Sequence, residues 1–237
     1  MSDMATIECQ NGNTVMEGFV ARPKGKGPYP AVLLFPGATG SGPTFERRVK
    51  ELATLGYLAV GINVYEKGSD LSSEQAAGEH FMALLSQPDE LRARVLAWAE
   101  TVGSLYDVDA HRMAALGYCF GGKCVLELAR GGGAVLAVAA FHGLLETHAP
   151  ASPGKIKARV VAWCAGKDPY APLEHVDAFR SEMAASQTAH QITVFSDAQH
   201  SFSDPDHHGL QPGIAYDAVA DAVSWAGTLA LLQMELR

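Results

Sequence analysis

GYCFGG, at residues 117–122, lies between an apolar stretch at 112–116 and a segment of helical periodicity at 123–129. Glycines on both sides of the cysteine indicate a sharp strand-to-helix turn, where larger side chains would collide with the neighbouring strand and helix. Such a turn lifts the side chain of Cys119 above the sheet. It also places the sulfur at a helix N-terminus, where partial positive charge favours the thiolate. The segment therefore predicts a nucleophilic cysteine.

The rest of the chain alternates apolar stretches of strand length with segments of helical periodicity. This pattern predicts an α/β fold with a mostly parallel central sheet and helices on both faces. Residues 6–21, interrupted by Asn-Gly-Asn, predict an N-terminal antiparallel hairpin. No break in composition divides the sequence, so we expect one domain over residues 1–237. Further strands are expected at 31–35, 58–62, 135–141, 158–164 and 191–195, and helices at 45–55, 173–185 and 214–232, with two between 72 and 106.

Composition and charge favour a small-molecule partner. The net charge is -8 and there is no run rich in Lys and Arg, so we expect no nucleic-acid partner. The first ten residues do not resemble a signal peptide, and every apolar run is shorter than the roughly 20 residues of a membrane span. We therefore expect a cytoplasmic protein with no membrane partner. The sequence does not indicate an oligomeric state.

The cysteines and histidines do not form a metal-binding pattern. The four cysteines include no CxxC pair, and the pair His207-His208 lacks nearby ligands at a metal-binding spacing. We therefore expect no metal site. Cys9, Cys124 and Cys164 are interpreted as small buried hydrophobic residues.

A base and an acid follow two later strands in the order that an α/β sheet with a nucleophilic turn requires. Asp168 comes after the strand at 158–164, and His200 after the strand at 191–195. Asp168 precedes a proline and could instead be only a turn residue. The backbone N–H groups of Phe120 and Ala38 are the expected donors to an oxyanion.

Aromatic residues beside these segments are the candidates for a substrate pocket. Tyr118, Phe141 and Phe202 are expected pocket walls, although aromatic residues at such positions are as often part of the core. His142 ends a predicted strand. It is interpreted either as a pocket wall or as a structural residue, because local hydrogen bonds readily satisfy a histidine.

Three motifs together resemble the dienelactone hydrolase (carboxymethylenebutenolidase) family. They are GYCFGG at 117–122, AGKDP at 165–169 and AQHSF at 198–202, and the likeness extends over nearly the whole chain. The resemblance implies an α/β-hydrolase fold, no metal or organic cofactor, and a catalytic triad at Cys119, Asp168 and His200.

Two positions depart from that family. Its best-known members carry a glutamate after the first buried strand that keeps the resting thiol neutral, whereas this chain has Phe-Pro-Gly at 35–37. We therefore predict that Cys119 is more persistently a thiolate paired with His200 and more easily oxidised. The same members place an arginine for the substrate carboxylate directly after His-Ser-Phe, where this chain has Ser203 and Asp204. Arg47 or Arg48 could substitute for it from the next helix.

These observations predict a hydrolase that cleaves an ester or lactone of a small molecule through a thioester at Cys119. Two alternatives stay open. The first is a thiol redox or peroxide-sensing protein that uses Cys119, and the second is a binding protein without catalytic activity on the same fold.

Overall fold

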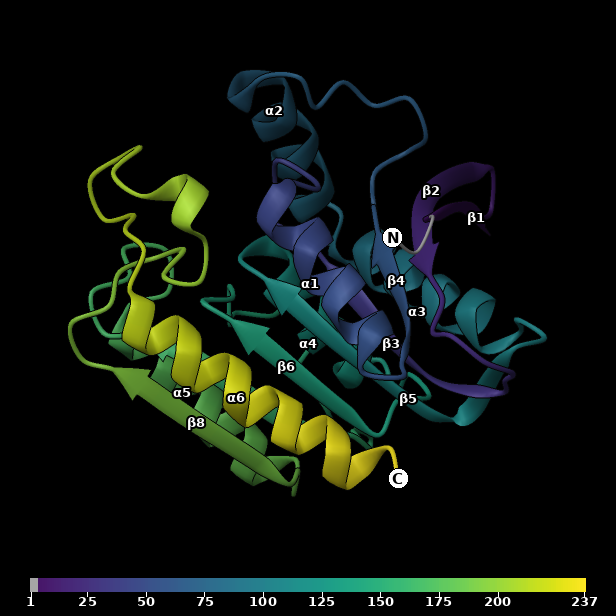
Figure 1. The fold of residues 1–237 in the computed structure, drawn as a ribbon. Helices are drawn as coiled ribbons and strands as arrows, with labels where there is room; N and C mark the ends of the chain where they lie inside the picture. The colour runs from purple at the N-terminus through teal and green to yellow at the C-terminus, as the bar shows by residue number, and fades with distance from the viewer. Residues whose placement is uncertain (1–3) are drawn as a thin grey trace.

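The computed structural model describes residues 4–237, and these form a sheet of eight strands in the order β1-β2-β4-β3-β5-β6-β7-β8 (Figure 1). Strands β1 (Ala5–Asn11) and β2 (Thr14–Ala21) pair antiparallel across the Asn-Gly turn, and β2 pairs antiparallel with β4. The remaining neighbours are parallel. The predicted hairpin and mostly parallel sheet are confirmed.

The other strands lie close to their predicted positions. One difference is that β5 begins before the predicted residue 112, because Val108 pairs with Tyr29 ahead of an irregularity in the register. This part of β5 contains charged residues, so the apolar pattern of the sequence did not predict it as strand. The strands are β3 (Tyr29–Phe35), β4 (Leu58–Ile62), β5 (Val108–Tyr118), β6 (Ala137–Phe141), β7 (Arg159–Ala165) and β8 (His190–Phe195).

The helices also agree with the sequence in number and order among the described residues, apart from a short 3-10 helix, η1 (Pro205–His207), that was not predicted. The last helix starts later than the predicted residue 214, because the side chain of Asp217 accepts hydrogen bonds from the N–H groups of Val219 and Ala220 and caps it. The helices are α1 (Pro43–Thr54), α2 (Glu74–Leu85), α3 (Pro88–Gly103), α4 (Phe120–Arg130), α5 (Leu173–Ala185) and α6 (Ala218–Glu235).

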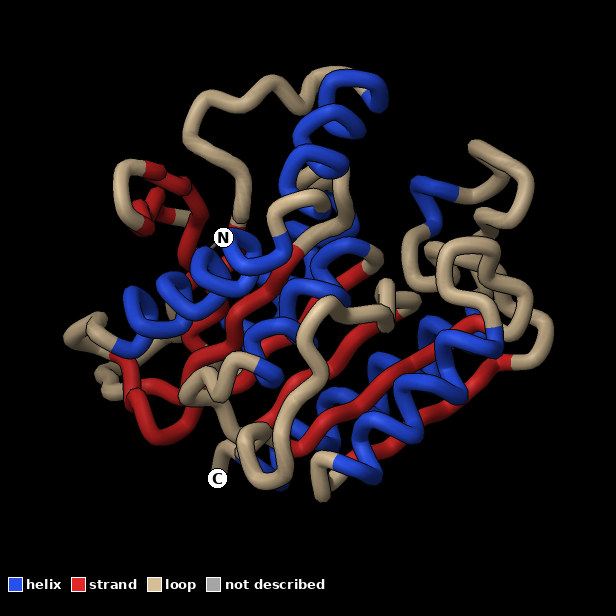
Figure 2. The backbone as a smooth tube through the Cα atoms, turned by 180° about the vertical axis from the view of Figure 1, so that it is seen from behind, coloured by secondary structure: helices blue, strands red, loops and turns tan. Residues whose placement is uncertain are grey.

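Helices cover both faces of the sheet (Figures 1 and 2). On β3, Leu33 belongs to the core packed with α3, α4 and α5, whereas Val32 and Leu34 belong to the core packed with α1 and α6. Neighbouring strand residues point to opposite faces, so the apolar β3 supplies both cores. The predicted three-layer arrangement is confirmed.

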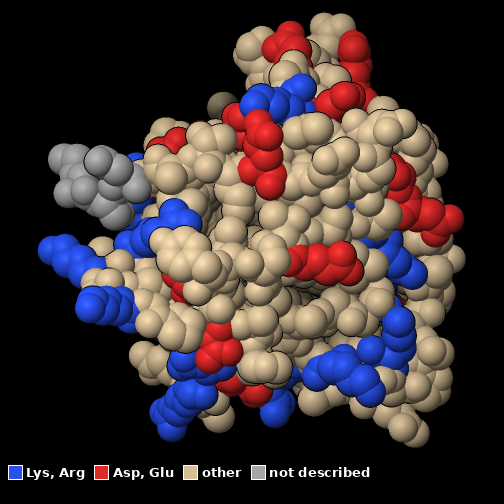
Figure 3. Space-filling view, turned by 90° about the vertical axis from the view of Figure 1, so that its right-hand side faces the viewer, with Lys and Arg blue, Asp and Glu red and all other residues tan. Residues whose placement is uncertain are grey.

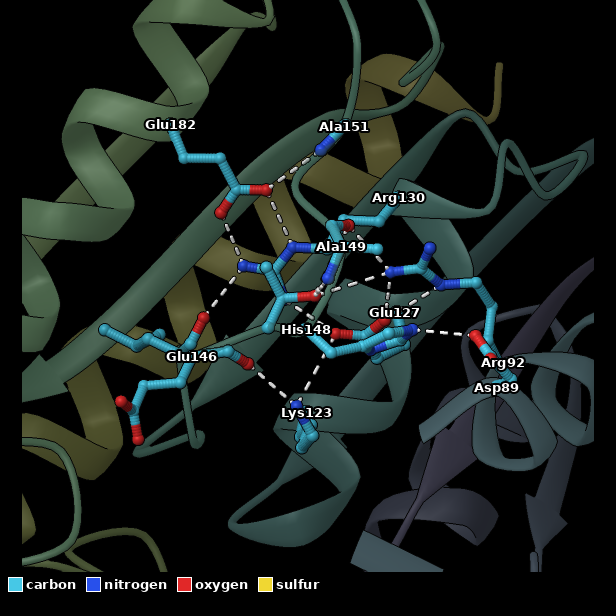
Figure 4. A network of polar contacts seen from close by, with 12 residues as sticks. Asp89, Arg92, Lys123, Glu127, Arg130, Glu146, His148, Ala149, Ala151 and Glu182 are labelled. Carbon is cyan, nitrogen blue, oxygen red and sulfur yellow. Dashed lines mark hydrogen bonds and ion pairs between the residues drawn. The ribbon is translucent and has the colours of Figure 1, made fainter. Parts of the chain in front are cut away.

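Helix α4 is buried along its whole length. Its charged residues belong to a network of polar contacts (Figure 4). Glu127, which is 1% exposed, pairs with Arg92 of α3 and with Arg130 of α4. Arg130 in turn pairs with Glu182 of α5, at 2.6 Å, and Lys123 donates to the carbonyl of Glu146 at 2.7 Å. This buried ion network holds α4 between α3 and α5, and thereby fixes the helix whose first turn follows Cys119.

The surface is mixed in charge on the face shown in Figure 3. Its basic side chains lie in separate groups with acidic side chains between them, and much of the central area carries neither. Within residues 4–237, no helix combines the length and the apolar composition that a membrane crossing requires.

Candidate active site

Cys119 occupies a strained turn between β5 and α4. Its φ of 53° and ψ of −115° lie in a region that residues other than glycine rarely adopt. Its N–H donates to the carbonyl of Phe141 at 3.0 Å. A Cβ on Gly117 would lie 1.9 Å from the carbonyl oxygen of Gly121, and one on Gly121 would lie 2.0 Å from that of Phe35. Both glycines are therefore required, and the turn leaves the Cys119 side chain partly exposed above the sheet.

Asp168 and His200 follow β7 and β8 and are hydrogen-bonded to each other. The Nδ1–H of His200 donates to Oδ2 of Asp168 at 2.8 Å, and both side chains are buried. The other carboxylate oxygen of Asp168 accepts from the N–H groups of Tyr170 and Ala171. Asp168 is thus both a turn residue and the partner of His200. The backbone of His200 is held in turn by hydrogen bonds to residues 213 and 215.

His200 is also coupled to Cys119. Burial lowers the pKa of this imidazole, but hydrogen bonding to Asp168 and to Cys119 outweighs burial and raises the pKa of His200 to about 10. The imidazole is therefore protonated at neutral pH, and Cys119 lies near enough to contribute to this shift. The structure thus brings Cys119, His200 and Asp168 together at the carboxyl ends of three parallel strands.

Two backbone N–H groups near Cys119 are free to bind an anion. Phe120 is the first residue of α4, and within residues 4–237 neither its N–H nor that of Ala38 donates a hydrogen bond. The loop at 36–38 lies against the turn, since a Cβ on Gly37 would be 3.7 Å from the Cβ of Cys119. The hydroxyl of Tyr65 donates to the carbonyl of Ala38 at 2.9 Å and braces this loop.

A cavity adjoins Cys119, between the loop at 36–42, the start of α1 and the loop at 201–207. Tyr118 and His142 line it, as the sequence predicts. Phe141 and Phe202 do not line it, which agrees with the alternative that they belong to the core. Their rings pack into the core on the α1 and α6 face, where Phe141 stacks on Tyr118 at 4.7 Å and Phe202 contacts His142 at 5.0 Å between centroids. The two rings therefore pack against residues that line the cavity.

His142 forms a buried pair with Ser203 that the sequence did not indicate. Nε2 of His142 lies 2.8 Å from Oγ of Ser203, and each residue is 3% exposed. The φ of His142 is 39°, in the strained region, and its Nδ1 has no hydrogen-bond partner within residues 4–237. Burial and the nearby charge of His200 hold the pKa of His142 well below its usual value. His142 is therefore neutral when His200 is charged.

The structure offers no cluster of three or more His, Cys, Asp or Glu side chains suited to a metal ion in residues 4–237. His207 and His208 are adjacent in sequence, but their side chains contact different residues. Nδ1 of His207 lies 3.6 Å from Asp204, whereas Nδ1 of His208 accepts from the N–H of Tyr216.

Comparison with known proteins agrees with this geometry. Residues 16–236 match the model of the dienelactone hydrolase family. The chain belongs to the dienelactone hydrolase family. Over 231 residues it is 26% identical to a Bradyrhizobium protein named "Probable 2-oxo-3-(5-oxofuran-2-ylidene)propanoate lactonase", and the match covers 92% of this chain and 89% of that one.

Solved structures of dienelactone hydrolases and their relatives have the same fold. A dienelactone hydrolase-like promiscuous phosphotriesterase from metagenomic libraries superposes with a TM-score of 0.91 at 29% identity, covering 99% of each chain. The dienelactone hydrolase of Anabaena variabilis superposes with a TM-score of 0.71 at 18% identity, covering 100% of this chain and 99% of the other. The predicted α/β-hydrolase fold is thus confirmed, and the protein belongs to a family of hydrolases.

The raised pKa of His200 predicts how stability depends on pH in this dienelactone hydrolase family member. A pKa of about 10 in the folded state exceeds the roughly 6.5 of an unfolded histidine, so protonation of His200 stabilises the fold fully below about pH 6.5. That contribution is lost as the pH rises towards 10. We expect the urea midpoint of the wild type to exceed that of His200→Gln by more at pH 6 than at pH 9.5. An equal difference at both values would contradict the assignment.

Proposed function

We propose that the protein hydrolyses an ester or lactone of a small molecule through a thioester formed on Cys119. The observation that carries this proposal is the placement of a charged His200, oriented by Asp168, beside a cysteine on a strained turn. Such an imidazolium favours the thiolate, which is the nucleophilic form of cysteine. The family membership supports hydrolysis as the class of reaction.

The mechanism follows from the positions of these groups. The thiolate of Cys119 attacks the carbonyl carbon, and the N–H groups of Phe120 and Ala38 bind the oxyanion that develops. Collapse of this intermediate breaks the bond to the leaving oxygen, which takes a proton from His200 and leaves a thioester on the sulfur. His200, now neutral, removes a proton from water, and the resulting hydroxide attacks the thioester. The acid departs, and the thiolate and imidazolium are restored.

The remaining cysteines bear on the redox alternative. A peroxide-reducing thiol commonly acts with a second, resolving cysteine. Cys9, Cys124 and Cys164 are all buried and unpaired, and burial raises the pKa of each. None of them is suited to resolve an oxidised Cys119, so the structure favours acyl transfer.

Rapid mixing with a panel of p-nitrophenyl esters and lactones tests the proposal. We expect turnover, and acid quenching in the first turnover should yield an acyl group on the peptide that contains Cys119, detected by mass spectrometry. Cys9→Ala, which removes a buried cysteine from β1, should still form this adduct. Peroxide reduction without ester turnover would favour the redox alternative, and inactivity in both assays would favour a binding protein.

A further inference from the structure

The cavity beside Cys119 contains one arginine, and its charge is already balanced. Arg48 of α1 lines the cavity, but its side chain is only 12% exposed. Nη2 lies 2.8 Å from Asp221 and Nη1 lies 3.2 Å from Glu51, while the guanidinium stacks 4.2 Å from the ring centre of Trp225. Two carboxylates thus balance the charge of this guanidinium, so it would attract a substrate anion less than an unpaired arginine would. Arg47, the other candidate cation on this helix, is exposed and does not line the cavity.

Another part of the cavity wall carries a neutral pair. His142 and Ser203 are hydrogen-bonded to each other, and the low pKa of His142 keeps its ring uncharged beside the charged His200. This wall therefore offers polar atoms to a substrate but no positive charge.

Asp204, next in sequence to Ser203, also lines the cavity. Among the described residues that line the cavity, it is the only acidic one. Oδ1 of Asp204 accepts from the N–H of Asp206, and Oδ2 lies 3.6 Å from Nδ1 of His207, which is too long for a hydrogen bond. Arg48 is paired with Asp221 and Glu51, and among the described residues no Lys or Arg side chain pairs with Asp204. The negative charge of Asp204 on the cavity wall is therefore not balanced by a permanent cation.

We propose that this site selects esters and lactones whose acyl part is uncharged, and that Asp204 determines the selection by repelling a substrate carboxylate. The inference rests on the proposed ester hydrolysis and names its substrate class. Like charges within a few ångströms, in surroundings partly removed from water, repel strongly enough to change a rate constant by about tenfold or more. The imidazole of His200 does not offset this effect, because it is engaged by Asp168 and Cys119 and does not line the cavity.

Two esters with the same acyl chain, one neutral and one anionic, provide the test. The p-nitrophenyl ester of adipic acid monomethyl ester is neutral, and mono-p-nitrophenyl adipate carries one carboxylate with an acyl chain of the same length. At pH 8 and low ionic strength we expect kcat/KM to be at least about tenfold higher for the neutral ester, after division by the rates of hydroxide-catalysed hydrolysis. Added salt should narrow this ratio, because mobile ions screen the repulsion.

Two variants locate the effect. Asp204→Asn removes the charge and keeps an oxygen that can accept from the N–H of Asp206. It should bring the ratio of kcat/KM for the neutral ester to kcat/KM for the anionic ester several-fold closer to one. Asp109→Asn makes the same change of charge near the start of β5, at the opposite end of the strand from Cys119, and should leave the ratio as in the wild type. Equal use of the two esters, or a ratio unmoved by Asp204→Asn, would overturn the inference while leaving ester hydrolysis intact. Failure to turn over either ester through Cys119 would overturn both proposals.

Discussion

Replacing Cys119 by alanine is expected to lower kcat/KM for an activated ester by about 10⁴-fold or more, because loss of a catalytic nucleophile typically has an effect of this size. Without the sulfur no thioester forms, and water must attack the ester directly. The N–H groups of Phe120 and Ala38 and the cavity remain, so some rate above that in buffer should persist. Steady-state kinetics with p-nitrophenyl butyrate measure the loss.

Cys119→Ser provides the matched comparison. Serine preserves the size of the side chain, but its hydroxyl does not ionise at neutral pH as a thiol does, so it is the weaker nucleophile at this position. We therefore expect the serine variant to lose most of the activity although its fold is intact, as circular dichroism and the urea midpoint would report. Retention of a tenth or more of the wild-type rate by the alanine variant would place the chemistry on another residue.

The sequence predicts those parts of the site that depend on local backbone chemistry. The turn around Cys119 could be identified because it requires glycine at two positions. A Cβ at Gly117 would lie 1.9 Å from a carbonyl oxygen, and one at Gly121 would lie 2.0 Å from another. Asp168 and His200 could be identified because strand ends in a parallel sheet meet at one edge. The strand order and the contact between these side chains required the structure.

Side-chain direction and long-range pairing were not predictable in the same way. Phe141 and Phe202 flank the site in sequence, yet their rings turn into the core, which depends on packing against α1 and α6. The pairing of His142 with Ser203 joins residues 61 positions apart and follows no periodicity. Glu127 and Arg130 similarly look like surface residues of a helix, and only their partners on α3 and α5 explain their burial.

Replacing Glu127 by glutamine is expected to lower the free energy of unfolding by about 3–5 kcal/mol, the usual cost of breaking a buried ion pair. The carboxylate is 1% exposed and contacts Arg92, Lys123 and Arg130, so its loss leaves buried positive charges with too few partners. Burial alone would raise the pKa of Glu127, but these neighbouring cations lower it. The network therefore contributes its full stability above about pH 4.3, the pKa of an unfolded glutamate. This contribution is lost as the pH falls through the lower pKa that Glu127 has in the folded protein. Urea denaturation at pH 7 measures the effect.

An exposed ion pair provides the control for Glu127→Gln. Glu46 pairs with Lys50 on the surface of α1 at 3.3 Å, with both side chains more than 40% exposed, so Glu46→Gln should change stability by less than about 1 kcal/mol. The buried variant should also lose catalytic rate as denaturant is added before global unfolding, because α4 begins directly after Cys119 and is held from behind by this network. Equal stability losses in the two variants would mean that the buried network contributes no more than a surface pair, and that packing alone holds α4 in place.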